Sequence, residues 1–345
     1  MHSFLKNLHN QHACGRHLVT LARWVFGGVA LLTGMGVLYQ ALASAQDKRR
    51  YGAPGTFIDV GGHRLHALRS GEEGPAVILE AGLGGSSLDW SLVQPEVATF
   101  ARVCSYDRAG YGWSDPGPSP RSSQQIVNEL HELLPRVGMK PPYILVGHSV
   151  GGLHLRLYAC QHPEHVAGMV LVDASPEDQR TRMPKPPFKQ RLGQQIQWYL
   201  FHLRPVLARL GLFRLQGKPH GVIDALPPAL QPVARAMGLR SQAYGWVFGE
   251  AHAIEQSEAQ MRAAASFPPI PLIVLTAVGG EWPSADMKQC WLELQAELAL
   301  RSPHGSHRIT EESGHFIHVD QPHLVIDAIR DVVTMVQHGT SSEAP

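Results

Sequence analysis

Short apolar runs alternate with amphipathic segments along most of the chain. The longest apolar runs predict strands at Ala76–Leu79, Val103–Tyr106, Tyr143–Val146, Met169–Val172, Leu272–Leu275 and His307–Ile309. Two earlier runs, Thr56–Val60 and Arg64–Leu68, are separated by Gly61-Gly62, which is typical of a hairpin. The amphipathic segments predict helices at 123–137, 284–300 and 322–336. Strands that alternate with helices predict βαβ units, an α/β fold and a largely parallel sheet.

The alternation stops between Ser175 and about Phe267. This stretch is rich in helix-forming residues and is interrupted by prolines such as Pro186, Pro227 and Pro232. It therefore predicts a helical cap at 175–267, inserted between two strands of a core that covers 51–174 and 268–338. The last residues, 339–345, are expected to form a disordered tail.

The N-terminal segment, residues 1–50, has a different pattern. From Trp24 to Ala45 it carries no charge over about 22 residues, enough for a helix to cross a ~30 Å hydrocarbon core. We interpret it as a single-pass membrane anchor. The alternative is a secretory signal cleaved near Ala45, because Ala43-Ser44-Ala45 is a small-x-small site. Basic residues flank the apolar run on both sides, so the orientation across the membrane is left open.

Composition excludes some functions. The chain has 345 residues, which suits one catalytic domain with appendages. Its 30 basic and 29 acidic residues give a net charge of +1, so the chain lacks the positive excess typical of nucleic-acid binding and no nucleic-acid partner is expected. Four scattered cysteines without a C-x-x-C spacing are interpreted as free, largely buried thiols.

Gly147-His148-Ser149-Val150-Gly151 is the strongest chemical signal. It follows a predicted strand and opens a predicted helix. In such a G-x-S-x-G turn the glycines let strand and helix backbones approach while the serine hydroxyl is pushed outward. The pattern predicts Ser149 as a nucleophile at the carboxyl edge of the sheet.

A serine nucleophile needs a base and an oxyanion site. Of the 20 histidines, His315 is the best candidate base, because it lies just past the last predicted strand. Backbone amides of Leu83, in the loop Gly82-Leu83-Gly84-Gly85, and of Val150 can bind the oxyanion. The histidine pairs 63/66, 162/165 and 315/318 lack an obvious third ligand, so no metal and no cofactor are predicted.

Four segments together resemble the α/β-hydrolase superfamily in order and spacing. They are Leu79–Gly84, Asp107–Ser114, the turn around Ser149, and Gly314-His315 followed by Asp320-Gln321-Pro322. The resemblance covers about 56–336 and implies an eight-stranded sheet, helices on both faces, a cap between strands six and seven, and Ser149 and His315 as catalytic residues. Ala81 departs from the pattern, because many members have histidine there.

The triad acid is the open point. Many members carry an aspartate shortly after the strand that corresponds to Leu272–Leu275, but no aspartate appears in this loop before Asp286. Other members take the acid from the end of the preceding strand, where this chain has Asp173. We predict Asp173, with Glu281 as the alternative acid.

The expected function is therefore that of a serine hydrolase, of the carboxylesterase or lipase type, acting on a small-molecule ester or lipid-like substrate. A peptidase or lactonase of the same fold is an alternative. A ligand receptor or binding module with little turnover is a further alternative from a different class, because a fold does not dictate a function.

Overall fold

Within the described residues, eight strands form one central sheet in the order β1-β2-β4-β3-β5-β6-β7-β8. The computed structural model describes the backbone over 2–185 and 188–342, and the side chains of 21–185, 193 and 195–338. The strands are β1 (Thr56–Asp59), β2 (Arg64–Ser70), β3 (Ala76–Glu80), β4 (Arg102–Tyr106), β5 (Tyr143–His148), β6 (Val166–Val172), β7 (Leu272–Ala277) and β8 (Gly305–Thr310).

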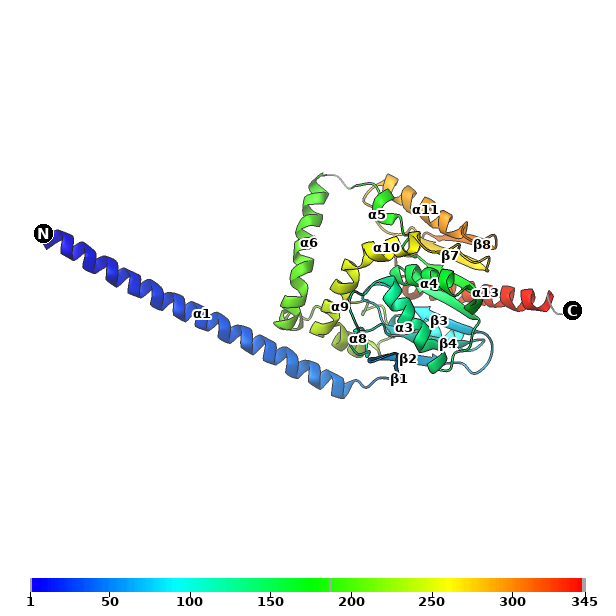
Figure 1. Cartoon of the computed structure of the whole chain (residues 1–345), viewed down its shortest axis with the longest axis horizontal. Helices are drawn as coiled ribbons and strands as arrows, with labels where there is room; N and C mark the ends of the chain where they lie inside the picture. The colour runs from blue at the N-terminus through cyan, green and yellow to red at the C-terminus, as the bar shows by residue number, and fades with distance from the viewer. Residues whose placement is uncertain (1, 186–187, 343–345) are drawn as a thin grey trace.

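The sheet is parallel except at one edge. β1 pairs antiparallel with β2, and β2 pairs antiparallel with β4, whereas the other neighbours are parallel. The predicted hairpin and the predicted mostly parallel α/β sheet are both confirmed (Figure 1). Parallel strands end at the same edge, so the residues that follow β3, β5, β6 and β7 are brought close together.

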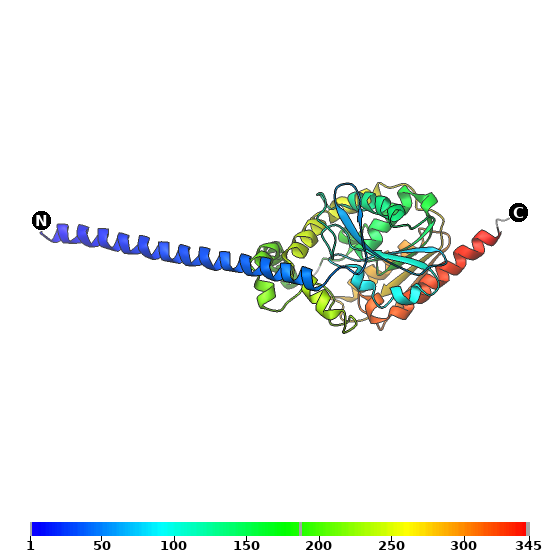
Figure 2. The same ribbon diagram turned by 90° about the horizontal axis from the view of Figure 1, so that it is seen from below.

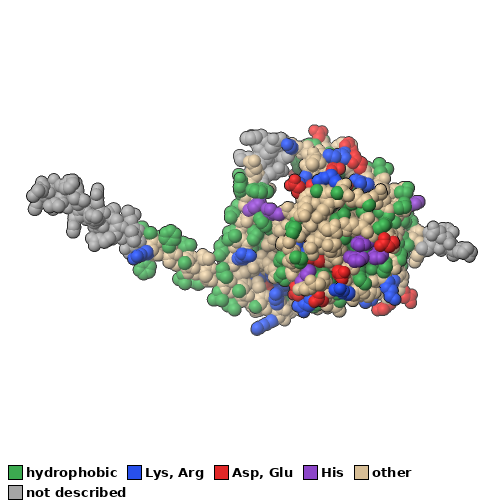
Figure 3. Space-filling model, in the orientation of Figure 1, with side chains coloured by type: hydrophobic (Ala, Val, Ile, Leu, Met, Phe, Trp, Pro, Cys, Tyr) green, Lys and Arg blue, Asp and Glu red, His purple; other side chains and the backbone are tan. Residues whose placement is uncertain are grey.

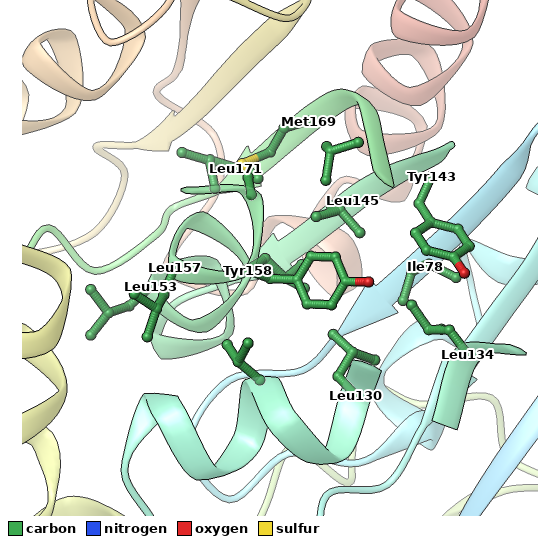
Figure 4. Packing of buried hydrophobic residues seen from close by; sticks show 14 of the residues in the cluster. Ile78, Leu130, Leu134, Tyr143, Leu145, Leu153, Leu157, Tyr158, Met169 and Leu171 are labelled. Carbon is green, nitrogen blue, oxygen red and sulfur yellow. The ribbon is translucent and has the colours of Figure 1, made fainter. Parts of the chain in front are cut away.

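Alternate residues of each central strand point to opposite faces. Ile78 and Leu145 pack on one face with the helices α3 (Ser123–Arg136) and α4 (Val150–Gln161), as Figure 4 shows. Val77 and Val146 pack on the other face. That face is covered by η1 (Ser87–Trp90), α2 (Gln94–Val97), α12 (Ile317–Asp320) and α13 (Pro322–Ser342). Both faces are thus buried, as the apolar strand sequences require.

A group of helices connects β6 to β7 in place of a short crossover. They are α5 (Gln179–Arg182), α6 (Phe188–Arg209), α7 (Leu212–Leu215), α8 (Gln231–Gly238), α9 (Ser241–His252) and α10 (Ile254–Arg262). We call these helices and the loops between them the cap. α11 (Ala285–Ala299) then leads from β7 to β8, and η2 (Pro163–His165) joins α4 to β6. The cap is inserted where the proline-rich stretch predicted it.

The N-terminal helix α1 (His2–Arg50) projects away from the rest of the molecule (Figures 1 and 2). Its residues 21–50 are long and apolar enough to cross a membrane. Every residue from Leu21 to Met35 is exposed, but further on the helix contacts the cap. Gln40 is buried and donates to the Leu239 carbonyl at 2.8 Å, and Asp47 forms an ion pair with Arg214 at 2.8 Å.

The closing helix α13 is longer than the sequence predicted. It continues to Ser342, so the tail expected to be disordered is helical over 339–342, and 343–345 lie outside the described residues. Among the described side chains, Cys104, Cys160 and Cys290 are free thiols, and the first two are buried. Cys14 lies outside the described side chains.

Candidate active site

Ser149 lies on a strained turn between β5 and α4. Its backbone adopts φ 53° and ψ −125°, a region that non-glycine residues rarely occupy. Two hydrogen bonds hold this turn: the Ser149 amide donates to the Val172 carbonyl at 3.1 Å, and the Ser149 carbonyl accepts from the Ser175 amide at 2.9 Å. Such strain persists only where the surroundings determine the backbone, and it presents the hydroxyl at the sheet edge.

The two glycines of the turn are required by close backbone approach. A Cβ on Gly147 would lie 2.7 Å from the Gly152 Cα, and a Cβ on Gly151 would lie 2.6 Å from the Ala81 carbonyl oxygen. Both distances are shorter than side-chain carbons tolerate. The strand, the helix and the loop after β3 therefore pack against one another through these glycines, as the sequence pattern predicted.

His315 and Asp173 form a hydrogen-bonded pair at the same edge. His315 lies in the loop between β8 and α12, and Asp173 directly follows β6. The Nδ1 atom of His315 is 2.6 Å from Oδ2 of Asp173. The second oxygen, Oδ1, accepts from the Ala277 amide and from the Trp291 indole, both at 3.1 Å. The buried carboxylate is thus held by donors on both oxygens and fixes the imidazole ring.

The alternative acid is placed differently. Glu281 is exposed in the loop after β7. The described hydrogen bond of the His315 Nδ1 atom is with Asp173. The structure therefore brings Asp173 to the histidine from the end of β6.

Ser149 and His315 line one cavity of about 490 Å³ beneath the cap. Its walls include the loop Gly82–Gly85, and Gly221 and Val222 from the cap. Among the described contacts, no hydrogen bond joins the Ser149 hydroxyl to His315. In ligand-free enzymes such a contact is often long and shortens when substrate binds.

The loop after β3 lies directly against the serine. A Cβ on Gly82 would lie 3.1 Å from the Ser149 Cβ and 2.7 Å from the Nδ1 atom of His148. The amides of Leu83 and Val150 donate no hydrogen bond among those described, and Val150 is the first residue of α4, where amides lack a partner within the helix. These two groups are available to a negatively charged oxygen in the cavity.

Arg108 anchors this loop, a role that the sequence pattern did not reveal. Its guanidinium donates to the carbonyls of Ala81 and Gly82 at 2.6 and 2.7 Å, and to Glu80 at 2.7 Å. It also bonds Glu250 of the cap helix α9 at 2.9 and 3.0 Å. Burial acts to raise the pKa of Glu250, but Arg108 lowers it to about 2. The buried pair joins the loop Gly82–Gly85 to the cap.

His148, beside the nucleophile, supports the histidine loop. Its Nε2 atom lies 2.9 Å from the His315 carbonyl oxygen, so this nitrogen carries the proton and donates. Burial, and then the neighbouring rings of His318 and His315, hold the pKa of His148 well below its usual value. The ring is therefore neutral and positions the backbone of the loop that carries His315.

Two further polar side chains line the cavity and were not singled out from the sequence. Asp89 of η1 is 9% exposed, and burial raises its pKa to about 7. His220 of the cap lies across the cavity, and burial lowers its pKa. Nothing in the local sequence of either residue marks it, because only the packing of η1 against the cap brings them together.

Comparison with known proteins agrees with this architecture. The family model described as alpha/beta hydrolase fold matches residues 75–322. The chain is 37% identical over 136 residues to the probable transporter efuK of Hormonema carpetanum, which is 37% of this chain and 20% of that protein. The chain spans less than half the length of the curated relatives it matches.

Two solved structures show the same fold. The enol-lactonase from Burkholderia xenovorans LB400 has a TM-score of 0.59 at 18% identity, over 81% of this chain and all of that one. The carboxylesterase CesB from Bacillus subtilis has a TM-score of 0.54 at 17% identity, over 87% of this chain and 98% of that one. The family match covers most of the chain and includes strands β3 to β8, the turn at Ser149 and His315. The chain therefore belongs to the alpha/beta hydrolase fold family.

Proposed function

We propose that this protein is a serine hydrolase that cleaves carboxylic ester bonds through an acyl-enzyme on Ser149. The observation that carries the proposal is the 2.6 Å hydrogen bond from His315 to the buried Asp173, beside a strained Ser149 in one cavity. A receptor would need neither the fixed imidazole nor the strained serine, because binding alone uses neither group.

The geometry supports a division of roles. The Ser149 hydroxyl attacks the ester carbonyl while the free Nε2 of His315 accepts its proton. Asp173 keeps the proton on Nδ1 and stabilises the imidazolium that forms. The amides of Leu83 and Val150 stabilise the oxyanion of the tetrahedral intermediate. His315 then protonates the leaving alcohol, and water, activated by the same ring, releases the acid and restores Ser149.

The decisive experiment is labelling of the full-length protein with a fluorophosphonate probe, followed by turnover of p-nitrophenyl esters of increasing chain length. The wild type should react with both, and Ser149→Ala should lose labelling and at least ~10⁴-fold of the turnover while keeping its circular-dichroism spectrum. Ser91→Ala is the matched control and should behave as wild type. A folded wild type that neither labels nor turns over would favour a ligand receptor.

We further propose that α1 anchors the enzyme in a membrane and that its substrates are lipid-like. The uncharged run of α1 begins after Arg23, and a helix needs about 20 residues at ~1.5 Å per residue to cross the ~30 Å core of a bilayer, so the span extends past Met35. A full span therefore has to include the part of α1 that contacts the cap. The adjoining cap surface would then lie at the membrane boundary.

The side chains of the cap fit that position. Its helix α6 exposes Trp198, Tyr199, Leu200 and Leu203, and Figure 3 shows hydrophobic side chains along both α6 and α1. Aromatic and aliphatic side chains on one helix surface are typical of helices that lie in the membrane interface. The contacts of Gln40 and Asp47 with the cap support retention of α1 over cleavage near Ala45, because cleavage there would remove the Gln40 contact.

Extraction of expressing membranes with sodium carbonate at pH 11 tests the anchor. The protein should remain in the membrane pellet, and its N-terminal residue, determined by sequencing, should lie before Trp24. A mature protein that begins near Gln46 in the soluble fraction would show the helix to be a cleaved signal.

A further inference from the structure

A cluster of three histidines lies away from the catalytic cavity. His131 belongs to α3, His162 follows α4, and His165 ends η2. One ring nitrogen from each lies within 4.8 Å of the others. The cluster is at the far end of α4 from Ser149, about 18 Å away along a helix that rises ~1.5 Å per residue. It is therefore separate from the proposed catalytic chemistry.

The fold supplies the third histidine. His162 and His165 are three residues apart, and the sequence showed no third ligand near them. Packing of α3 against α4, through Leu130 and Tyr158 among others, brings His131 to the pair. Its ring lies 4.2 Å from that of His162 and 5.5 Å from that of His165, measured between centroids. Figure 3 shows histidine side chains gathered on the face that carries α3 and α4.

Two of the ring nitrogens lack partners. The Nδ1 atoms of His131 and His165 are buried and form no hydrogen bond. A buried polar atom without a partner costs about 1–3 kcal/mol, so such atoms need an explanation. The other nitrogen of His165, Nε2, lies 3.6 Å from a carboxylate oxygen of Glu164. A carboxylate there favours the proton on Nε2 and leaves the Nδ1 lone pair free, which is the usual arrangement behind a metal-bound histidine.

The three imidazole rings are stacked on one another. The rings are nearly parallel, at 14° between His131 and His162 and 7° between His131 and His165. Ligation requires them to turn about the Cα–Cβ and Cβ–Cγ bonds until the nitrogens converge.

We propose that His131, His162 and His165 form a binding site for a divalent transition-metal ion of the zinc type. Three imidazoles select Zn²⁺, Co²⁺ or Ni²⁺ over Mg²⁺ and Ca²⁺, which prefer oxygen ligands. Water completes a tetrahedral site at the surface. The ion fastens α3 to the connection between α4 and β6. Its effect is on stability and not on the ester chemistry.

The test uses the untagged full-length protein in detergent, dialysed against EDTA and then against metal-free buffer. Titration with Co²⁺ should show one site per chain, with the strong visible absorption of tetrahedral cobalt. Zn²⁺ should abolish that absorption and raise the thermal midpoint by several degrees. Mg²⁺ should do neither.

Variants decide whether these three residues make the site. His131→Ala and His165→Gln should each weaken Co²⁺ binding by more than ~10-fold, since even loss of an outer-shell partner costs about 10–100-fold. His323→Ala, an exposed histidine on α13, is the matched control and should bind as wild type. Ser149→Ala should also bind as wild type, which separates this site from the proposed esterase. Absence of the cobalt absorption, or binding that survives both cluster variants, would overturn the proposal. Thermal midpoints in EDTA show whether each variant is folded.

Discussion

The carboxyl edge of the sheet and the outer face of the cap differ in where their apolar side chains lie. The strands that carry the candidate site are buried on both faces, and Leu79 and Val172 are fully inaccessible to solvent. The cap helix α6 instead leaves Trp198, Tyr199 and Leu200 between 52% and 64% exposed. The strands that position the candidate site are thus fixed by packing on both faces, whereas the cap presents apolar side chains on its outer surface.

One buried ion pair joins these two regions. Arg108 holds the loop after β3 and also pairs with Glu250 of the cap. Movement of the cap is therefore coupled to this loop, the proposed oxyanion site. Substitutions should accordingly have their largest effect at the sheet edge, a smaller one at the boundary with the cap, and the smallest on the cap surface.

The largest effect is expected at the acid. Asp173→Asn should preserve the fold but lower kcat/KM for a p-nitrophenyl ester by up to ~10⁴-fold, because an amide holds the wrong imidazole tautomer. Glu281→Gln is the matched control and should retain nearly full activity, since Glu281 is exposed and none of the described hydrogen bonds joins it to His315. The opposite ranking of the two variants would assign the acid to the loop after β7.

The free energy of unfolding should depend on pH through Asp89, which lies where η1 packs against the cap. Burial raises its pKa in the folded state to about 7, above the usual value near 4, so the folded protein binds this proton more tightly than the unfolded chain. The free energy that this proton contributes to folding is fully present below pH 4 and is lost as the pH rises through about 7. Relative to wild type, Asp89→Asn should gain about 3–4 kcal/mol in unfolding free energy between pH 4 and pH 8.

Chemical unfolding in detergent at several pH values measures this gain. Glu73→Gln, an exposed surface carboxylate, serves as the control. A difference between Asp89→Asn and wild type that stays constant with pH would mean that Asp89 titrates normally.

Loss of the ion pair between Arg108 and Glu250, which joins the core to the cap, should have a smaller effect than loss of the acid. It should have a larger effect on stability than loss of a surface ion pair. Glu250→Gln leaves Arg108 buried with one charged partner fewer, and should lower the unfolding free energy by about 2–3 kcal/mol. Glu297→Gln breaks the exposed pair with Arg182 and should cost less than ~1 kcal/mol. Equal losses for the two variants would show that Glu250 does not tie the cap to the core.

The smallest effect is expected on α6. Replacement of both Leu200 and Leu203 by Gln should slow hydrolysis of a long-chain ester in vesicles several-fold, because both side chains lose apolar contact with lipid while α1 still anchors the protein. Turnover of soluble p-nitrophenyl acetate should not change. Leu300→Gln, an exposed leucine outside the cap, is the control. If soluble and vesicle-bound esters respond alike, α6 serves the fold and not the membrane.

The strands and the serine turn were predictable because their signals are local. A fully buried strand needs a continuous apolar run, and the approach of Gly147 and Gly151 to neighbouring backbone excludes side chains at both positions. The closing helix was predicted too short, because polar residues at its end carry no apolar period. Arg108 shows the limit of this reasoning: its partners Glu80 and Glu250 are 28 and 142 residues away.

Two questions depended on tertiary structure alone. The sequence offered Asp173 and Glu281 as acids on two different strands, and the loop after β8 places His315 against Asp173 at the end of β6, across the neighbouring strand β7. The pair His162 and His165 looked incomplete until α3 and α4 were packed together and His131 approached it. By itself the sequence determined the sheet, the helical insertion and the turn at Ser149, since apolar periodicity and backbone sterics act between neighbouring residues. The carboxylate partner of His315, the anchor of the loop after β3 and the histidine cluster were decided by the fold, because each joins side chains that only packing brings within reach.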